Sequence, residues 1–175
     1  MENVNPEKLQ EQEKLHTNEF KASVRVTIAS MLIGICFTVF ALVWAFDRNV
    51  KLNHFIMSQL IFAMPILYYS TTAYSKLGYK KNAGLWNKFA VVTFIIGYSL
   101  IINAIGIMIY VADLFINAIL FFVLVWLLDI IYSICEIAED RKNLRERIVK
   151  TGFFILATFG LGLFVILNDR FHLLF

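Results

Sequence analysis

Five apolar runs, each about as long as a lipid bilayer is thick, occupy most of this 175-residue chain. They lie at residues 26–46, 55–75, 89–112, 114–135 and 151–168, and Asp129 is the one charged residue inside them. A helix needs about 20 residues to cross the hydrocarbon core. The sequence therefore predicts an all-α, polytopic integral membrane protein with five transmembrane helices.

Composition excludes the other fold classes. Hydrophobic residues make up 59% of the chain and charged residues 17%, whereas soluble domains carry roughly 25% charged residues. Membrane β-strands alternate in polarity and need only about 10 residues. These runs are continuous and about twice that length, so a β-barrel is not expected.

The domain plan follows from the runs. We expect a polar cytoplasmic segment at 1–25 and a transmembrane domain over 26–175, with the fifth span at 149–168 and a cytoplasmic extension of the fourth helix at 136–148. A polar helix is expected from Pro6 toward His16, with a break at Thr17 or Asn18. Asp113 is expected to form the turn before the fourth helix and to cap it.

Basic residues predict the orientation. Cytoplasmic loops of membrane proteins are enriched in Lys and Arg. In a five-span chain, four basic residues at 1–25, four at 76–88 and five at 136–150 share one side, and Arg48, Lys51 and Arg170 lie on the other. This distribution predicts a cytoplasmic N-terminus and an outside C-terminus.

Two of the expected spans carry polar residues at helical spacing. One stripe includes Ser58, Tyr68 and Thr72, with Pro65 as a possible hinge between them. The other includes Ser99, Asn103 and Tyr110. Such stripes either hold helices together or line an aqueous path, and both interpretations stay open at this point.

The first span carries a ladder of small residues, Ser30, Gly34 and Thr38. Small residues four positions apart let another helix approach closely. We expect packing within the chain, with a subunit interface as the alternative.

Asp129 is the most unusual residue in the spans. Ionisable residues inside a membrane mark ion or proton sites, or they pair with a basic group. We expect a salt bridge, with Arg25 as the first candidate partner and Lys150 as the second. An ion or proton site is the alternative.

No enzymatic function is expected. The three histidines, His16, His54 and His172, lack the spacing of metal ligands, and no catalytic or phosphate-binding motif is present. No cofactor or metal is expected. The lipid bilayer, further copies of the chain and a cytoplasmic protein or nucleotide-type signal are the expected partners, and no binding of a nucleic-acid polymer is expected.

The layout of few helices, short loops and a basic cytoplasmic face resembles the small multi-pass membrane effectors of bacterial anti-phage defence systems. The resemblance implies a location in the bacterial inner membrane, self-association and opening of a pore on a cytoplasmic signal. The sequence thus favours a homo-oligomeric channel or pore-forming effector. The alternative is a non-conducting scaffold or accessory subunit of a larger complex.

Overall fold

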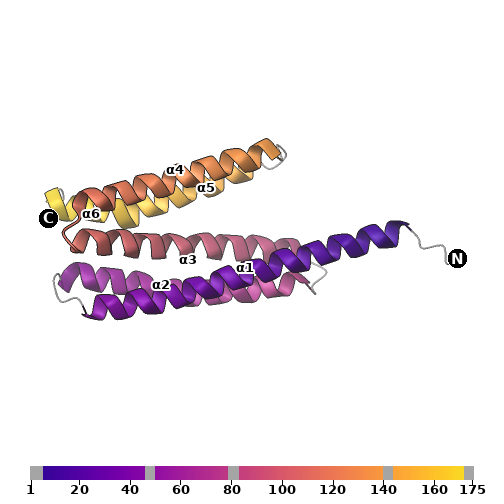
Figure 1. The fold of residues 1–175 in the computed structure, drawn as a ribbon, viewed down its shortest axis with the longest axis horizontal. Coiled ribbons are helices and arrows are strands. Elements are labelled where there is room, and N and C mark those ends of the chain that lie inside the picture. Colours follow the sequence, from indigo (N-terminus) through magenta and orange to yellow (C-terminus); the bar gives the residue numbers. More distant parts are fainter. Residues whose placement is uncertain (1–5, 46–49, 79–82, 140–143, 172–175) are drawn as a thin grey trace.

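The computed structural model describes residues 6–45, 50–78, 83–139 and 144–171, and all regular structure within them is helical. Five long helices run up and down, and the start of the first and the end of the last lie at opposite ends of the bundle (Figure 1). The elements in chain order are α1 (Pro6–Ala45), α2 (Val50–Ser75), a 3₁₀ turn η1 (Lys76–Gly78), α3 (Ala83–Val111), α4 (Phe115–Glu139), α5 (Leu144–Thr158), a π-helical turn η3 (Phe159–Leu163) and α6 (Phe164–Phe171).

The prediction of five span-length helices is confirmed. Within the described ranges, five segments are long and apolar enough to cross a membrane, and each overlaps one expected run. The helices extend beyond the apolar runs because polar residues without helix breakers continue them at their ends. The five segments are Ala22–Trp44, Lys51–Ser75, Gly84–Val111, Phe115–Ala138 and Leu144–Phe171.

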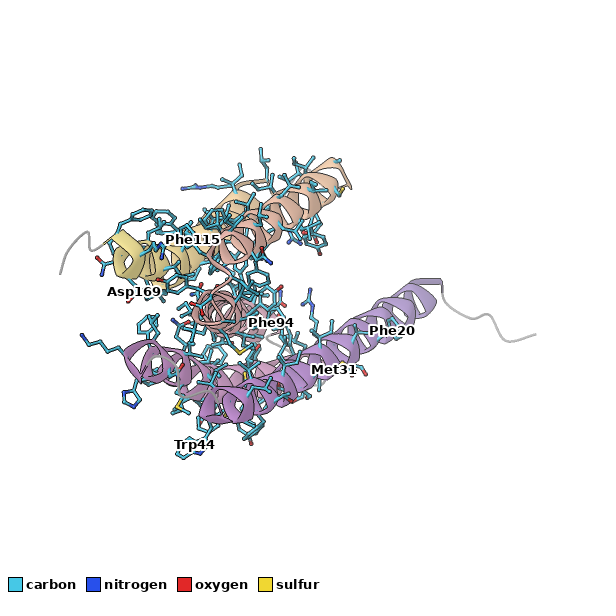
Figure 2. The ribbon with its side chains drawn as sticks, turned by 60° about the vertical axis from the view of Figure 1, so that its left-hand side comes forward. Phe20, Met31, Trp44, Phe94, Phe115 and Asp169 are labelled. Atoms are coloured by element: carbon cyan, nitrogen blue, oxygen red, sulfur yellow. The ribbon has the colours of Figure 1, made fainter. Side chains whose placement is uncertain are left out.

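The central helix of the bundle is α3. Half of its most apolar window is buried (50%), against 17–33% in the other spans. The α1–α2 pair packs along one side of it, and α4 with the α5–η3–α6 helix packs along the other. Figure 2 shows this arrangement, with Phe94 of α3 between the two pairs.

Glycines allow this close packing around α3. A Cβ at Gly97 would lie 2.7 Å from Cγ of Leu67 on α2. A Cβ at Gly106 would overlap the ring of Phe122 from α4, and one at Gly162 of η3 would lie 2.6 Å from the same ring. Phe122 is fully buried, so it fills a space left by two glycines on different helices.

The expected break near Thr17 or Asn18 is wrong, because α1 is one continuous 40-residue helix. Its interior contains no proline, and the Glu, Gln and Lys residues of its first turns are good helix formers. Such a helix is about 60 Å long, and its first turns project beyond the rest of the bundle (Figure 1).

Asp113 lies in the turn between α3 and α4, as predicted, and it ends helix α3. Its φ of 66° is the left-handed conformation. The N–H of Asp113 bonds to the carbonyl of Tyr110 at 3.0 Å and that of Leu114 to Ile109 at 3.3 Å, which is the Schellman pattern of a helix C-terminus. The carbonyl of Leu114 accepts a backbone bond from Ala118 at 2.9 Å at the start of α4, and the expected cap by Asp113 stays a prediction.

The expected extension at 136–148 divides between two helices. The end of α4 is at Glu139 and α5 begins at Leu144. Residues 140–143 of the expected extension lie outside the described residues.

Candidate functional site: a polar cavity at one end of the bundle

A cavity of about 320 Å³ lies at the end of the bundle where α2 and α4 finish and α3 and α5 begin. All five long helices contribute to its wall. The polar and charged lining residues are Arg25 of α1, Tyr74 of α2, Tyr98 of α3, Asp129, Tyr132, Ser133 and Glu136 of α4, and Arg147, Lys150 and Thr151 of α5.

Asp129 lines the cavity together with the hydroxyl residues Ser133 and Thr151. The hydroxyl oxygens of Ser133 and Thr151 lie 2.6 Å apart and share a hydrogen bond that joins α4 to α5. The carboxylate oxygen Oδ2 of Asp129 is buried without a hydrogen-bond partner.

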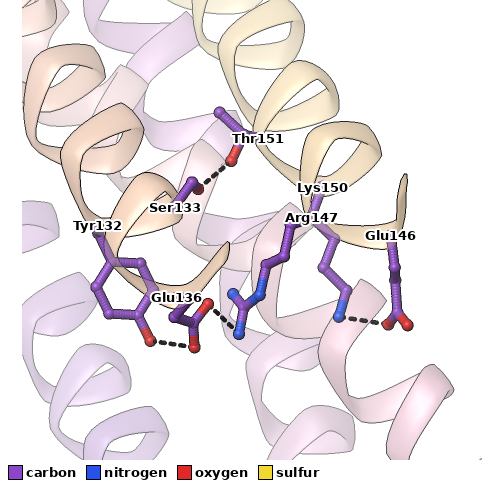
Figure 3. A network of polar contacts seen from close by, with 7 residues as sticks. All are labelled: Tyr132, Ser133, Glu136, Glu146, Arg147, Lys150 and Thr151. Atoms are coloured by element: carbon purple, nitrogen blue, oxygen red, sulfur yellow. Dashed lines mark hydrogen bonds and ion pairs between the residues drawn. The ribbon is translucent and has the colours of Figure 1, made fainter. Parts of the chain in front are cut away.

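The remaining charges of the α4–α5 wall are paired with one another (Figure 3). Arg147 forms an ion pair with Glu136, which also accepts a 2.9 Å hydrogen bond from the Tyr132 hydroxyl. Lys150 forms an ion pair with Glu146 at 2.6 Å, one helical turn away. The Arg147–Glu136 pair connects the last turns of α4 to the first turns of α5, and the Lys150–Glu146 pair lies within α5.

Arg25 lies on the opposite wall and has neutral partners. Its Nη1 donates to Oδ1 of Asn87 at 3.2 Å, and its guanidinium lies 5.2 Å from the centre of the Tyr74 ring. Arg25, Lys150 and Asp129 thus line one cavity, but neither predicted base forms an ion pair with Asp129 within the described residues. A third base, Arg147, lies one turn before Lys150 on α5 and lines the same cavity.

A row of aromatic rings forms the floor between these walls. Phe94 and Tyr98 stack with their ring centres 6.1 Å apart, and Tyr98 and Phe154 stack at 5.6 Å. Tyr74 meets Phe94 edge to face at 6.4 Å. All four residues line the cavity, so the charged groups face one another across an apolar surface.

The polar stripe of α3 lies inside the bundle. Ser99 and Asn103 are buried. Ser99 donates to the Ile95 carbonyl at 2.8 Å, and Asn103 Nδ2 donates to the Ala157 carbonyl of α5 at 3.4 Å. Tyr110 donates a 2.7 Å hydrogen bond to Asp169 at the far end of the bundle. Two residues of the α3 stripe thus bond to the last helical segments of the chain, Asn103 to α5 and Tyr110 to α6, whereas Ser99 bonds within α3.

The polar stripe of α2 lies outside the bundle. Ser58, Pro65 and Tyr68 are exposed and Thr72 is half-buried. Ser58 donates to the His54 carbonyl at 2.8 Å and Thr72 to the Tyr68 carbonyl at 3.0 Å. The helix continues through Pro65 as far as Ser75.

The ladder of α1 also faces outward, in place of the expected packing within the chain. Ser30, Gly34 and Thr38 are exposed, and a Cβ at Gly34 would meet nothing within 4 Å. The reason is that α1 uses a different face toward the bundle, formed by Ala22, Ala29, Cys36, Val39 and Val43.

Gln59 of α2 is a buried polar residue that the stripe pattern missed. Its Nε2 donates to the Leu161 carbonyl in η3 at 3.0 Å, while its Oε1 is buried without a partner. The signal was present in the sequence, because Gln59 is the only side-chain amide in the run 55–75. It lies one residue off the stripe of Ser58, and so on another face.

Among the residues that the structure describes, no three His, Cys, Asp or Glu side chains are grouped so that they could hold a metal ion. Comparison with protein-family models, curated proteins and solved structures finds no match to this chain.

Proposed function

We propose that this chain is a homo-oligomeric membrane channel whose path is lined by α2. The observation that supports this proposal is the opposite placement of the two polar stripes. The α3 stripe is used for packing inside one chain, whereas the α2 stripe of Ser58, Tyr68 and Thr72 is turned outward. An outward polar stripe along a span is best accommodated next to other copies of the chain or next to water.

The two outer faces of the bundle differ in a way that favours self-association through α1 and α2. Between Asn117 and Tyr132, every exposed residue of α4 is aliphatic, which suits contact with lipid tails. The outer faces of α1 and α2 carry the ladder and the hydroxyl stripe. Small and polar residues are typical of helix–helix interfaces in membranes.

A gate follows from the same geometry. Ile61 lies on the outer face of α2, one helical turn from Pro65, and its side chain is exposed. Ile102 is buried in the bundle and is unsuited to this role. A ring of Ile61 side chains would close an aqueous path by excluding water. Pro65 removes one backbone bond from α2 and gives the helix a point at which to bend.

Cysteine scanning tests the proposal. In a background without Cys36 and Cys135, single cysteines at Ser58, Tyr68 and Thr72 should react with a membrane-impermeant thiol reagent and block ion flux in liposomes. Ser99 and Asn103 are the buried controls, and Leu124, exposed on the aliphatic face of α4, is the lipid-facing control. All three controls should stay unlabelled.

The contrary outcome selects the alternative function. If the α2 positions stay as unreactive as Leu124, and the purified protein is monomeric and conducts no ions, a non-conducting scaffold or accessory subunit replaces the channel. The role in bacterial defence and the activating signal stay predictions from the layout of the sequence. Expressing the chain in bacteria and measuring their survival after phage infection tests these predictions separately.

A further inference from the structure

We propose that the cavity at the end of the bundle binds the headgroup of a zwitterionic phospholipid with a primary amine, its phosphate against Arg25 and its ammonium against Asp129. The inference concerns a binding site, and it does not depend on whether the chain conducts ions. It rests on how the charges are arranged around the cavity.

Among the residues that the structure describes, the cavity has one charge of each sign without an ion pair, on opposite walls. Arg147 and Lys150 are held in ion pairs with Glu136 and Glu146. Asp129 forms no ion pair within the described residues, and its Oδ2 is buried without a hydrogen-bond partner. Within the same part of the chain, the partners of Arg25 are the neutral residues Asn87 and Tyr74. A ligand with one positive and one negative group matches this arrangement, and a simple anion or cation does not.

The Arg25 side suits a phosphate. A guanidinium has five N–H donors in a planar fork, and one hydrogen bond, to Asn87, is observed. Arginine binds phosphate oxygens with two parallel hydrogen bonds. The stacking on Tyr74 holds the guanidinium at the cavity wall without using its donors.

The Asp129 side suits a primary ammonium and not a quaternary one. Oδ2 of Asp129 is buried and has no hydrogen-bond partner, and buried polar atoms are almost always bonded. A primary ammonium brings three N–H donors. A choline group has no N–H donor. Both cations are attracted to the aromatic rings of Phe94, Tyr98 and Phe154, so these rings do not distinguish them. Ethanolamine phospholipids should therefore bind better than choline phospholipids.

The size and the apolar walls indicate a lipid and not a free metabolite. A volume of about 320 Å³ is at the small end of ligand pockets, roughly 300–1,000 Å³, which fits a headgroup. Ile28, Val91 and Ile95 also line the cavity. Ile28 is exposed on the outside of α1 as well, so the lining reaches the lipid-facing surface where acyl chains lie.

Native mass spectrometry of the full chain tests the proposal. The detergent-purified protein is given equal amounts of phosphatidylethanolamine, phosphatidylcholine and phosphatidylglycerol with the same acyl chains. The ethanolamine lipid should be retained about tenfold better than the other two, the value of one hydrogen bond to a charged group. Equal retention of the three lipids would overturn the proposal without any variant.

Three variants separate the two ends of the site. Asp129→Asn should remove the preference for ethanolamine over choline, and Arg25→Gln should weaken the binding of all three lipids together. Lys150→Gln is the matched control, since Lys150 lines the same cavity but is paired with Glu146, and it should preserve the preference. An unchanged preference in Asp129→Asn contradicts the assignment. If that variant fails to fold, Thr151→Val tests the same end.

Free phosphoethanolamine distinguishes the source of the headgroup. At millimolar concentration it should not displace the bound lipid, because it lacks the contacts of the acyl chains with Ile28, Val91 and Ile95. Displacement at a concentration equal to that of the lipid would show that the site takes the soluble compound instead.

Discussion

The indole N–H of Trp126 donates a 2.8 Å hydrogen bond to the hydroxyl oxygen of Thr158, joining α4 to α5 within the apolar part of the bundle. The Thr158 hydroxyl in turn donates a hydrogen bond to the Phe154 carbonyl, also at 2.8 Å. A fully buried hydroxyl thus satisfies an indole on one helix and a carbonyl on another turn of its own helix. This bond is one of the few polar links between α4 and α5 away from the charged end.

We expect the Trp126–Thr158 pair to be energetically coupled. Side-chain hydrogen bonds between membrane helices are worth about 0.6 kcal/mol on average. A double-mutant cycle of Trp126→Phe and Thr158→Val, measured by reversible unfolding in mixed micelles, should give a coupling energy of that size. Additive effects of the two changes would mean that the hydrogen bond contributes nothing to the free energy of unfolding.

Two glycines of the π-helical turn should respond very differently to the same substitution. A Cβ at Gly162 would overlap Asn103 Oδ1 and approach Phe122, whereas one at Gly160 would meet nothing within 4 Å. Gly162→Ala should therefore destabilise the protein by about 1–3 kcal/mol through overpacking. Gly160→Ala should be neutral or stabilise it by about 0.4–1 kcal/mol. Thermal unfolding in detergent measures both, and equal effects would contradict the packing described here.

The left-handed conformation of Asp113 makes a specific prediction about side-chain shape. Asparagine adopts this conformation readily and β-branched residues do not. Asp113→Asn should leave the midpoint of thermal unfolding nearly unchanged. Asp113→Ile should lower the stability by about 1–2 kcal/mol. Both variants lose the carboxylate charge, so a similar loss in both would point to the charge and not to the backbone.

The orientation in the membrane is testable with reporter fusions. A periplasmic reporter fused after Phe175 should be active, and a fluorescent reporter that requires the cytoplasm should be dark at the same position. The reason is the bias of Lys and Arg toward 1–25, 76–88 and 136–150. The opposite pattern would reverse the predicted topology.

The number and position of the spans could be predicted because hydrophobic length alone determines them. The continuity of α1 could not, since Thr17 and Asn18 favour caps and turns as much as they tolerate a helix. The turn at Asp113 could be predicted, because 89–135 is too long for one span. The left-handed φ with which Asp113 ends α3 could not be predicted from the sequence.

The candidate site was predicted less well, for a physical reason. Residues at helical spacing share a face, but the sequence does not say which face turns inward. The stripes that contain Ser99 and Ser58 have the same spacing in the sequence. The Ser99 stripe lies inside the bundle, and the Ser58 stripe lies on its outer surface. Partner choice was equally hidden. Arg25, Arg147 and Lys150 all line the cavity that contains Asp129, and Arg147 and Lys150 are paired with Glu136 and Glu146 instead.

The unbroken course of α1 couples two parts of the protein mechanically. Its first turns lie beyond the apolar span that begins at Ala22, and its later turns pack along α2. Because α1 has no break at Thr17, a tilt or rotation of its projecting part moves the rest of the helix with it. A force applied at the N-terminal end of α1 would therefore reach α2 through a single rigid helix, without passing through a flexible connection.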